Sequence, residues 1–317
     1  YKGQEVSLEE AIDSWTSTLE EIYPTKTDLE ETKLADTKLY DAKKLYVAKN
    51  KVAKPKVFIP IFPGTNSEYN VIKAFEKAGA EVEAIVFKNL LPGDIERTIE
   101  VYEEAIRKSQ ILMLAGGLSA GDEPDGAGKF INIVLQKARI KEAINDLMEK
   151  RDGLILGIND GFHALIKLGL LPFGKIVSQE DFIGLTTNTI GRHNSKYVST
   201  KLVSNKSPWL MKAELGKVYK IPVSHKEGRF VASDDLIKKL FENGQVASQY
   251  VDEEGNPTMD SSYNPNGSFY GIEGILSPDG RIYGKMGHSE RVGEGVAINI
   301  PGSKDQQIFE SAIDYFK

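Results

Sequence analysis

Between residues 56 and 168, short apolar runs alternate regularly with amphipathic stretches, and this alternation most constrains the fold. The apolar runs are typical of buried strands, and each is followed by a stretch whose apolar residues recur at helical spacing. Strand and helix in this order predict a parallel sheet with helices on both faces. The predicted strands cover 57–62, 81–87, 111–117 and 153–158, and the predicted helices cover 68–78, 94–108, 129–150 and 161–168.

After about residue 180 the pattern changes to short segments in which apolar and polar residues alternate. Turn signals such as Pro278-Asp279-Gly280 separate these segments. We therefore expect antiparallel strands or hairpins added to the α/β core, with a final helix at about 304–316. The predicted strands are 196–203, 217–224, 228–233, 245–251, 268–277 and 281–287.

Residues 1–55 differ from the rest of the chain. Ser7 and Glu10 form a capping-box pattern, which predicts a helix running to about Tyr23, before Pro24. The lysine-rich stretch 33–56 is interpreted either as a linker with some helix or as a solvated tail. The domain division expected is 1–55 and 56–317.

Composition excludes several kinds of site. The chain of 317 residues has no cysteine, so disulfides, thiolate metal sites and a cysteine nucleophile are excluded. Four histidines are too few for a dense cluster, and no metal site is expected.

A net charge of −6 argues against binding to nucleic acid or to an anionic membrane surface. No apolar run approaches the roughly 18 residues that span a bilayer. We expect a cytoplasmic protein.

A sharp turn after the fourth predicted strand has the form of an active-site elbow. Gly157-Ile158-Asn159-Asp160-Gly161 has glycines at both ends, and its central side chain is expected to point into a cleft beside a helix N-terminus. Many enzymes hold a nucleophile at that position, but Asn159 carries an unreactive amide. An ordinary tight loop is the alternative that this motif alone leaves open.

Two further strand ends carry groups typical of an active site, since such groups collect at the carboxyl ends of parallel strands. The stretch from Gly116 to Asp122 can point backbone N–H groups into a cleft, as an oxyanion hole does, or it is a flexible turn. Glu290 follows His288 by two residues, which can place a carboxylate beside the imidazole. The alternative for His288 is a strand-end histidine that bonds only to the backbone.

In combination the three motifs follow the order of the class I glutamine amidotransferases, which carry a Cys-His-Glu triad. Over about residues 56–303, several long segments resemble the C-terminal glutaminase domain of the large, single-chain phosphoribosylformylglycinamidine synthase (FGAM synthase). Residues 1–55 resemble the tail of its preceding synthase domain plus a linker. The segments that carry the resemblance are FPGTNSEYNVIKAFEKAGAEVEAIVFKNL, GGLSAGDEPDGAGKFI, LILGINDGFHALIKLGLLP, NTIGRHNSKYVSTKL, PVSHKEGRF and NPNGSFYGIEGILSPDGRIYGKMGHSER.

The resemblance implies a flavodoxin-like α/β core, a mainly parallel sheet and a role in purine biosynthesis. The family's glutaminase domain hydrolyses glutamine and sends ammonia to a synthase domain of the same chain. ATP and magnesium are expected only in that synthase domain, and no cofactor is expected in this one. Carried over, His288 is the base and acid, and Glu290 orients it. The N–H groups near Gly117 and Leu118, with that of Asp160, hold the oxyanion.

The chain departs from the family pattern at the elbow. The family reads G-I-C-N-G-F-Q, where this chain reads G-I-N-D-G-F-H over residues 157–163. Asn159 cannot form the glutamyl thioester, so glutamine hydrolysis by the family mechanism is expected to be absent. His163 lies one helical turn beyond Asn159, and it either faces the same cleft or is a surface or capping residue. The sequence leaves open whether the cysteine was lost naturally or by engineering.

These observations predict a glutaminase-like domain that has lost glutamine hydrolysis and caps a synthase working with free ammonia. Two other interpretations remain. One is a non-catalytic module that binds glutamine or another small amide in the retained cleft. The other is an enzyme with new chemistry at Asp160, His163 and His288.

Overall fold

The structure, a computed structural model, describes residues 3, 5–24, 39–119, 126–178 and 182–317. Its strands are β1 Lys56–Ile61, β2 Glu81–Val86, β3 Ile111–Leu114, β4 Leu154–Ile158, β5 Ile183–Thr187, β6 Asn194–Leu202, β7 Val218–His225, β8 Glu227–Ala232, β9 Val246–Tyr250, β10 Ile272–Leu276 and β11 Ile282–Lys285. Its α-helices are α1 Leu8–Thr16, α2 Glu68–Ala78, α3 Asp94–Lys108, α4 Lys129–Leu135, α5 Ala138–Lys150, α6 Asp160–Lys167, α7 Leu170–Phe173, α8 Asp234–Glu242 and α9 Ile308–Phe316.

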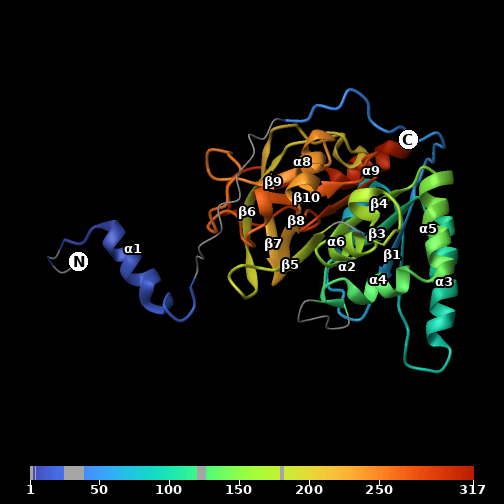
Figure 1. The fold of residues 1–317 in the computed structure, drawn as a ribbon, viewed down its shortest axis with the longest axis horizontal. Coiled ribbons are helices and arrows are strands. Elements are labelled where there is room, and N and C mark those ends of the chain that lie inside the picture. The colour runs from blue at the N-terminus through green and yellow to red at the C-terminus, as the bar shows by residue number, and fades with distance from the viewer. Residues whose placement is uncertain (1–2, 4, 25–38, 120–125, 179–181) are drawn as a thin grey trace.

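A mixed sheet runs through the α/β body (Figure 1). It has nine strands, in the order β2-β1-β3-β4-β11-β10-β9-β6-β7. Neighbours from β2 to β11 pair in parallel, and this is the strand order of a flavodoxin-like sheet. Neighbours from β11 to β7 pair antiparallel. The predicted fold class, a mainly parallel α/β core with added antiparallel strands, is confirmed.

The prediction for β11 was incomplete. Residues 281–287 were expected among the antiparallel strands, and β11 does pair antiparallel with β10, but it also pairs in parallel with β4. Alternating apolar residues show that a segment is a strand and do not specify its partner. As the fifth parallel strand, β11 brings its carboxyl end next to that of β4.

Helices cover both faces of the sheet, as the strand–helix alternation predicts. Tyr102 of α3 and Phe162 of α6 belong to the core on one face, together with the apolar side of α5. Phe75 of α2 and Phe309 of α9 belong to the core on the other face, where their ring centroids are 4.9 Å apart. The inner parallel strands β1, β3 and β4 are therefore buried on both sides, which explains their mainly apolar sequences.

Several helices differ from the sequence prediction. The helix predicted at 129–150 is two helices, because Lys137 has an extended conformation with φ −59° and ψ 134°. Helix α8 was not predicted, although Ser233 caps it through a hydrogen bond from the Leu236 N–H group. The last helix begins at Ile308 rather than 304, after Gln307 with φ 52°.

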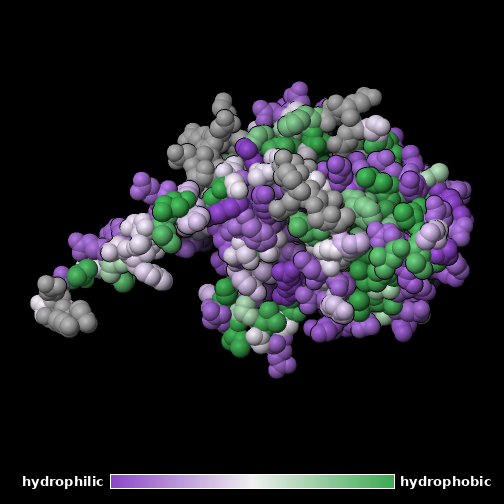
Figure 2. Space-filling model, turned by 90° about the horizontal axis from the view of Figure 1, so that it is seen from below, coloured by the Kyte–Doolittle hydropathy of each residue, from purple (hydrophilic) through white to green (hydrophobic). Residues whose placement is uncertain are grey.

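Helix α1 has the predicted capping box, in which Ser7 and Glu10 bond to each other's backbone N–H groups. The helix ends at Thr16, before the predicted boundary, and a short 3-10 turn follows. None of its residues is buried, and Trp15 is 83% exposed. Apolar side chains are accordingly visible along this N-terminal extension (Figure 2).

Residues 39–55 form a strap on the α/β body, so this part of the lysine-rich stretch is not a solvated tail. Ala48 is 2% exposed and belongs to the core beside α2 and α9. Asp152 accepts hydrogen bonds from the Tyr46 hydroxyl at 2.8 Å and from the Lys49 N–H group at 2.9 Å. Helix content in residues 25–38 lies outside the described residues.

In the part of the chain that the structure describes, no helix is long and apolar enough to cross a membrane.

Candidate functional site

Asn159 joins β4 to α6 in a strained conformation, with φ 55° and ψ −111°. Such a backbone is rare for a residue with a Cβ atom and persists only where the surroundings fix it. The Asn159 N–H group donates to the Lys285 carbonyl at 2.9 Å, and its carbonyl accepts N–H groups from the first turn of α6. Gly161 is required beside it, because a Cβ there would lie 2.1 Å from the Leu114 carbonyl oxygen.

His288 and Glu290 form a buried pair beyond the end of β11. The His288 Nδ1 atom lies 2.6 Å from Oε1 of Glu290, and the two side chains are 2% and 0% exposed. Because a carboxylate can only accept, Nδ1 carries the proton, and in the neutral ring Nε2 then has a free lone pair. The backbone N–H of His288 donates to the Pro222 carbonyl at 2.9 Å, which ties the pair to β7.

Gly116 lies between the elbow and the histidine. A Cβ on Gly116 would lie 2.9 Å from Cε1 of His288 and 3.3 Å from Cβ of Asn159. Only glycine lets the three segments approach this closely. The structure thus brings together the three strand ends that the sequence singled out.

The Leu118 N–H group does not fit the role expected from the family resemblance. It donates to the Gly64 carbonyl at 2.9 Å, so it is occupied within the protein and is not a donor for an oxyanion. Gly117 lines the pocket, and a Cβ on it would lie 2.5 Å from the Gly64 oxygen. Residues 120–122 of the predicted glycine-rich stretch lie outside the described residues.

The side chains of Asp160 and His163 point away from the pocket. The Asp160 carboxylate accepts the N–H group of Ser119 at 3.0 Å and that of Gly128. His163 is 2% exposed and its Nε2 lies 3.0 Å from the Glu227 carbonyl oxygen, so it is neither a surface nor a capping residue. Burial lowers the pKa of His163 to about 4, which keeps the ring neutral and makes Nε2 the donor. Both residues support loops around the site, which corrects the expectation that His163 faces the cleft.

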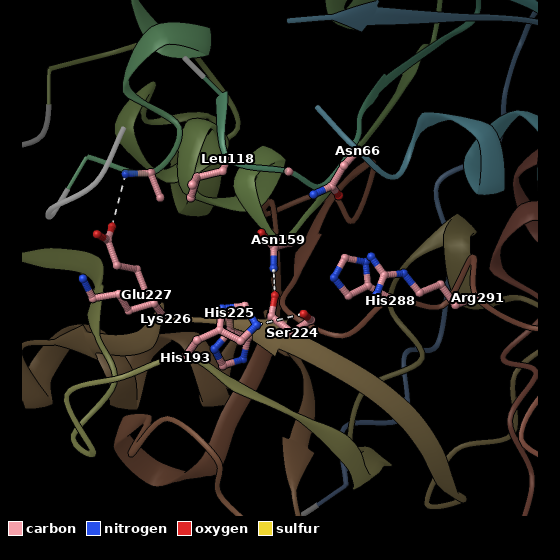
Figure 3. A pocket seen from close by; sticks show the side chains of 12 residues that line it. Asn66, Leu118, Asn159, His193, Ser224, His225, Lys226, Glu227, His288 and Arg291 are labelled. Carbon is pink, nitrogen blue, oxygen red and sulfur yellow. Dashed lines mark hydrogen bonds between the residues drawn. The ribbon is translucent and has the colours of Figure 1, made fainter. Parts of the chain in front are cut away.

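The pocket in front of the elbow has a volume of about 200 Å³ (Figure 3). Much of its lining comes from the β7–β8 connection and its neighbourhood, which the sequence had not assigned to the site. The segment PVSHKEGRF contributed to the family resemblance, and its position across from the elbow depends on sheet pairing distant in sequence. The lining residues are Asn66, Gly117, Leu118, Ala127, Asn159, His193, Ser224, His225, Lys226, Glu227, His288 and Arg291.

His225 lines the pocket as a neutral ring. The amide nitrogen of Asn188 donates to the carbonyls of His225 and Arg192, so its oxygen faces His225 Nδ1 at 3.2 Å. Nδ1 therefore carries the proton, and Nε2 holds a lone pair. Burial lowers the pKa of His225 to about 3, so the ring is neutral near pH 7. Nε2 is buried and has no hydrogen-bond partner among the described residues.

The Asn159 side chain is tied to β7. Its Nδ2 donates to the Ser224 carbonyl at 3.0 Å, which leaves Oδ1 as a second acceptor (Figure 3). The site therefore combines an elbow that carries an amide, a buried His–Glu pair and a pocket. Among the described residues, no group of three His, Cys, Asp or Glu side chains is arranged to hold a metal ion.

A flavodoxin-like sheet, a strained strand–helix elbow and a His–Glu pair beyond the next strand together define a protein of the glutamine amidotransferase class. Residues 54–316 match the family model described as a CobB/CobQ-like glutamine amidotransferase domain, and the chain belongs to this family.

Among its relatives is phosphoribosylformylglycinamidine synthase subunit PurQ of Sulfurimonas denitrificans, 34% identical over 251 residues, covering 78% of this chain and 96% of the relative. PurQ of Archaeoglobus fulgidus is 32% identical over 266 residues, with 80% and 94% covered. The structure of PurLQS from Thermotoga maritima matches with a TM-score of 0.59 and 26% identity, covering 83% of this chain and 100% of that one. The chain is thus a glutamine amidotransferase domain related to PurQ.

Proposed function

We propose that this chain is the glutaminase-like part of an FGAM synthase, and that Asn159 occupies the nucleophile position and abolishes glutamine hydrolysis. The observation that carries the proposal is that Asn159 and His288 line one pocket, with Gly116 packed between them and Glu290 bonded to the far side of the His288 ring. The relatives named as PurQ subunits of phosphoribosylformylglycinamidine synthase support the assignment to purine biosynthesis.

The chemistry explains why a single position decides activity. In an amidotransferase of this kind, a thiolate at the elbow attacks the side-chain carbonyl carbon of glutamine, and a histidine passes a proton to the departing ammonia. His288 has the required free Nε2 and a carboxylate behind it. Asn159 supplies no nucleophilic atom, since its amide nitrogen is conjugated and donates to Ser224. The acyl-enzyme bond therefore does not form.

The partner that we propose is a synthase component, to which this domain is a structural cap. The word subunit in the names of the PurQ relatives supports a separate synthase partner, and a synthase domain in the same chain remains a prediction. ATP and magnesium would be bound there, with free ammonia as the nitrogen source. The cytoplasmic location expected from the sequence also remains a prediction.

Glutamate release tests the proposal. The unmodified chain, with and without the synthase component, is expected to release no glutamate from glutamine above the buffer rate. Asn159→Cys is expected to release glutamate, because it supplies the missing thiol beside the His288–Glu290 pair. Adding His288→Asn to that variant removes the general base and is expected to lower the rate by about a hundredfold or more. Glutamine hydrolysis by the unmodified chain would overturn the proposal.

A second candidate function is glutamine binding without turnover. The observation that favours it is the Asn159 Oδ1 atom on the pocket lining, an acceptor that suits the N–H group of a primary carboxamide, with the neutral His225 ring on the same lining. Calorimetry on the unmodified chain separates the two functions. A sensor shows saturable heat with glutamine and loses it in His225→Phe, whereas a structural cap shows no heat with either protein.

A further inference from the structure

Lys285 is a fully buried lysine beneath the His288–Glu290 pair. Its Nζ atom lies 2.7 Å from Oγ of Ser289, 2.7 Å from Oε1 of Gln306 and 3.6 Å from Oε1 of Glu273. An ammonium group has three N–H donors, which matches these three oxygens. Burial lowers the pKa of Lys285, and the negative charges of Glu273 and Glu290 oppose that shift.

Glu273, on the neighbouring strand β10, hydrogen-bonds to the segment that carries His288. Its Oε1 atom accepts the N–H group of Gly287 at 2.7 Å, and its Oε2 atom accepts the Ser248 hydroxyl. Both Lys285 and Glu273 are 0% exposed at the side chain. Glu273 and Lys285 thus hydrogen-bond to Gly287 and Ser289 respectively, the residues immediately before and after His288.

The same lysine also reaches the elbow through its backbone. Its carbonyl accepts the Asn159 N–H group at 2.9 Å, where β11 runs in parallel with β4. The side chain and the carbonyl of one residue therefore connect the elbow, the histidine loop and the segment before α9.

A buried ion pair is a costly way to stabilise a core, because well-packed apolar side chains often give equal or greater stability. Here both charged side chains hydrogen-bond to residues 287–289, which we call the His288 loop. Glu273 accepts the Gly287 N–H group, and Lys285 donates to the Ser289 hydroxyl. We propose that Lys285 and Glu273 are positioning residues, which fix the His288–Glu290 hydrogen bond and its distance from the elbow. Neither residue lines the pocket, so they act through Gly287 and Ser289.

The test removes the pair as a unit, since a lone Lys285→Met would leave a buried carboxylate without its cation. In the otherwise unmodified chain, Glu273→Ala/Lys285→Met is expected to fold while the low-field NMR signal of the hydrogen-bonded His288 Nδ1 proton broadens or disappears. This readout does not require glutamine hydrolysis, so it stands even if the proposed function fails. Lys201→Met is the matched control, because Lys201 is partly buried and bonds to the Gly255 carbonyl, which lies outside the pocket lining and the His288 loop.

A kinetic readout follows in the Asn159→Cys background. The double substitution is expected to lower kcat by about tenfold to a hundredfold with little change in KM, since misplacing a catalytic group by about 1 Å costs up to that factor. Glu273→Gln/Lys285→Met retains an oxygen acceptor for Gly287 and is expected to recover part of kcat.

Two results would overturn the proposal. The first is a folded double variant that keeps both the His288 signal and kcat, which would reduce the pair to ordinary packing. If the double variant does not fold, Ser289→Ala decides, because it removes only one hydroxyl of the network. A His288 signal and a kcat unchanged by Ser289→Ala would then contradict the positioning role, and loss of the signal with a lower kcat would support it.

Discussion

Two histidines around the pocket are held neutral by burial. The pKa of His163 is lowered to about 4 and that of His225 to about 3, in both cases mainly because burial disfavours the charged ring. In the unfolded chain both rings titrate near their ordinary value of about 6.5. Between these values the unfolded chain binds more protons than the folded chain, so the free energy of unfolding falls as pH is lowered through this window.

His163→Gln is expected to weaken this pH dependence, since glutamine can still donate to the Glu227 carbonyl but does not titrate. The His163 contribution is present in full above about pH 6.5, and its loss by pH 4 is on the order of 3 kcal/mol. Urea denaturation at a series of pH values measures the effect as the difference between the two proteins. Identical pH profiles would show that His163 is not buried in a neutral form.

At the scale of elements, the strap of residues 39–55 depends on Asp152. This residue is 4% exposed, has φ 53°, and its backbone carbonyl also accepts the Tyr315 hydroxyl at 2.8 Å. Its carboxylate is the acceptor for Tyr46 and Lys49. Asp152 therefore connects the strap to the start of β4 and to α9.

Asp152→Ala is expected to lower the free energy of unfolding by about 2 kcal/mol, because two partly buried donors lose their acceptor. Asp41→Ala, on the same strap, removes only an exposed hydrogen bond from Asn205 and is expected to change it by less than about 0.5 kcal/mol. Urea denaturation followed by circular dichroism measures both. Equal effects of the two substitutions would contradict an anchoring role for Asp152.

The sequence predicted elements better than their pairing. The spacing of apolar residues and the length of each apolar run identified the parallel strands, because burial on both faces imposes continuous apolar runs such as Leu154–Ile158. They did not reveal that β11 pairs with β4, since pairing between strands so distant in sequence depends on the whole sheet. Helix α8 was missed although Ser233 and two aspartates give it an ordinary N-terminal signal.

The candidate site likewise contains residues that the sequence predicted and contacts that it did not. Asn159, His288 and Glu290 were predictable, because short motifs at strand ends carry them. The position of His225 opposite the elbow was not, because it depends on the packing of β7 against the parallel half. The occupation of the Leu118 N–H group by Gly64 was also not predictable, because it depends on contact between two separate loops.

At the scale of the whole molecule, the continuous sheet predicts that the parallel and antiparallel halves unfold together. Trp209 is a suitable probe, because it is fully buried, donates to the Arg281 carbonyl at 3.0 Å and packs on Phe75 of α2. In a Trp15→Phe background, which removes the exposed tryptophan, its fluorescence and the far-ultraviolet circular dichroism are expected to give one shared urea midpoint. Two separated midpoints would show that the halves are independent.

The central claim is that Asn159, in the place of a nucleophile, prevents formation of the acyl-enzyme, and intact-mass spectrometry after rapid quenching with acid tests it most directly. Asn159→Cys is incubated with glutamine, with and without the synthase component, beside the unmodified chain. The account predicts a glutamyl adduct at residue 159 in the variant and none in the unmodified chain. An adduct on the unmodified chain, or a variant that forms no adduct and releases no glutamate under either condition, would contradict it.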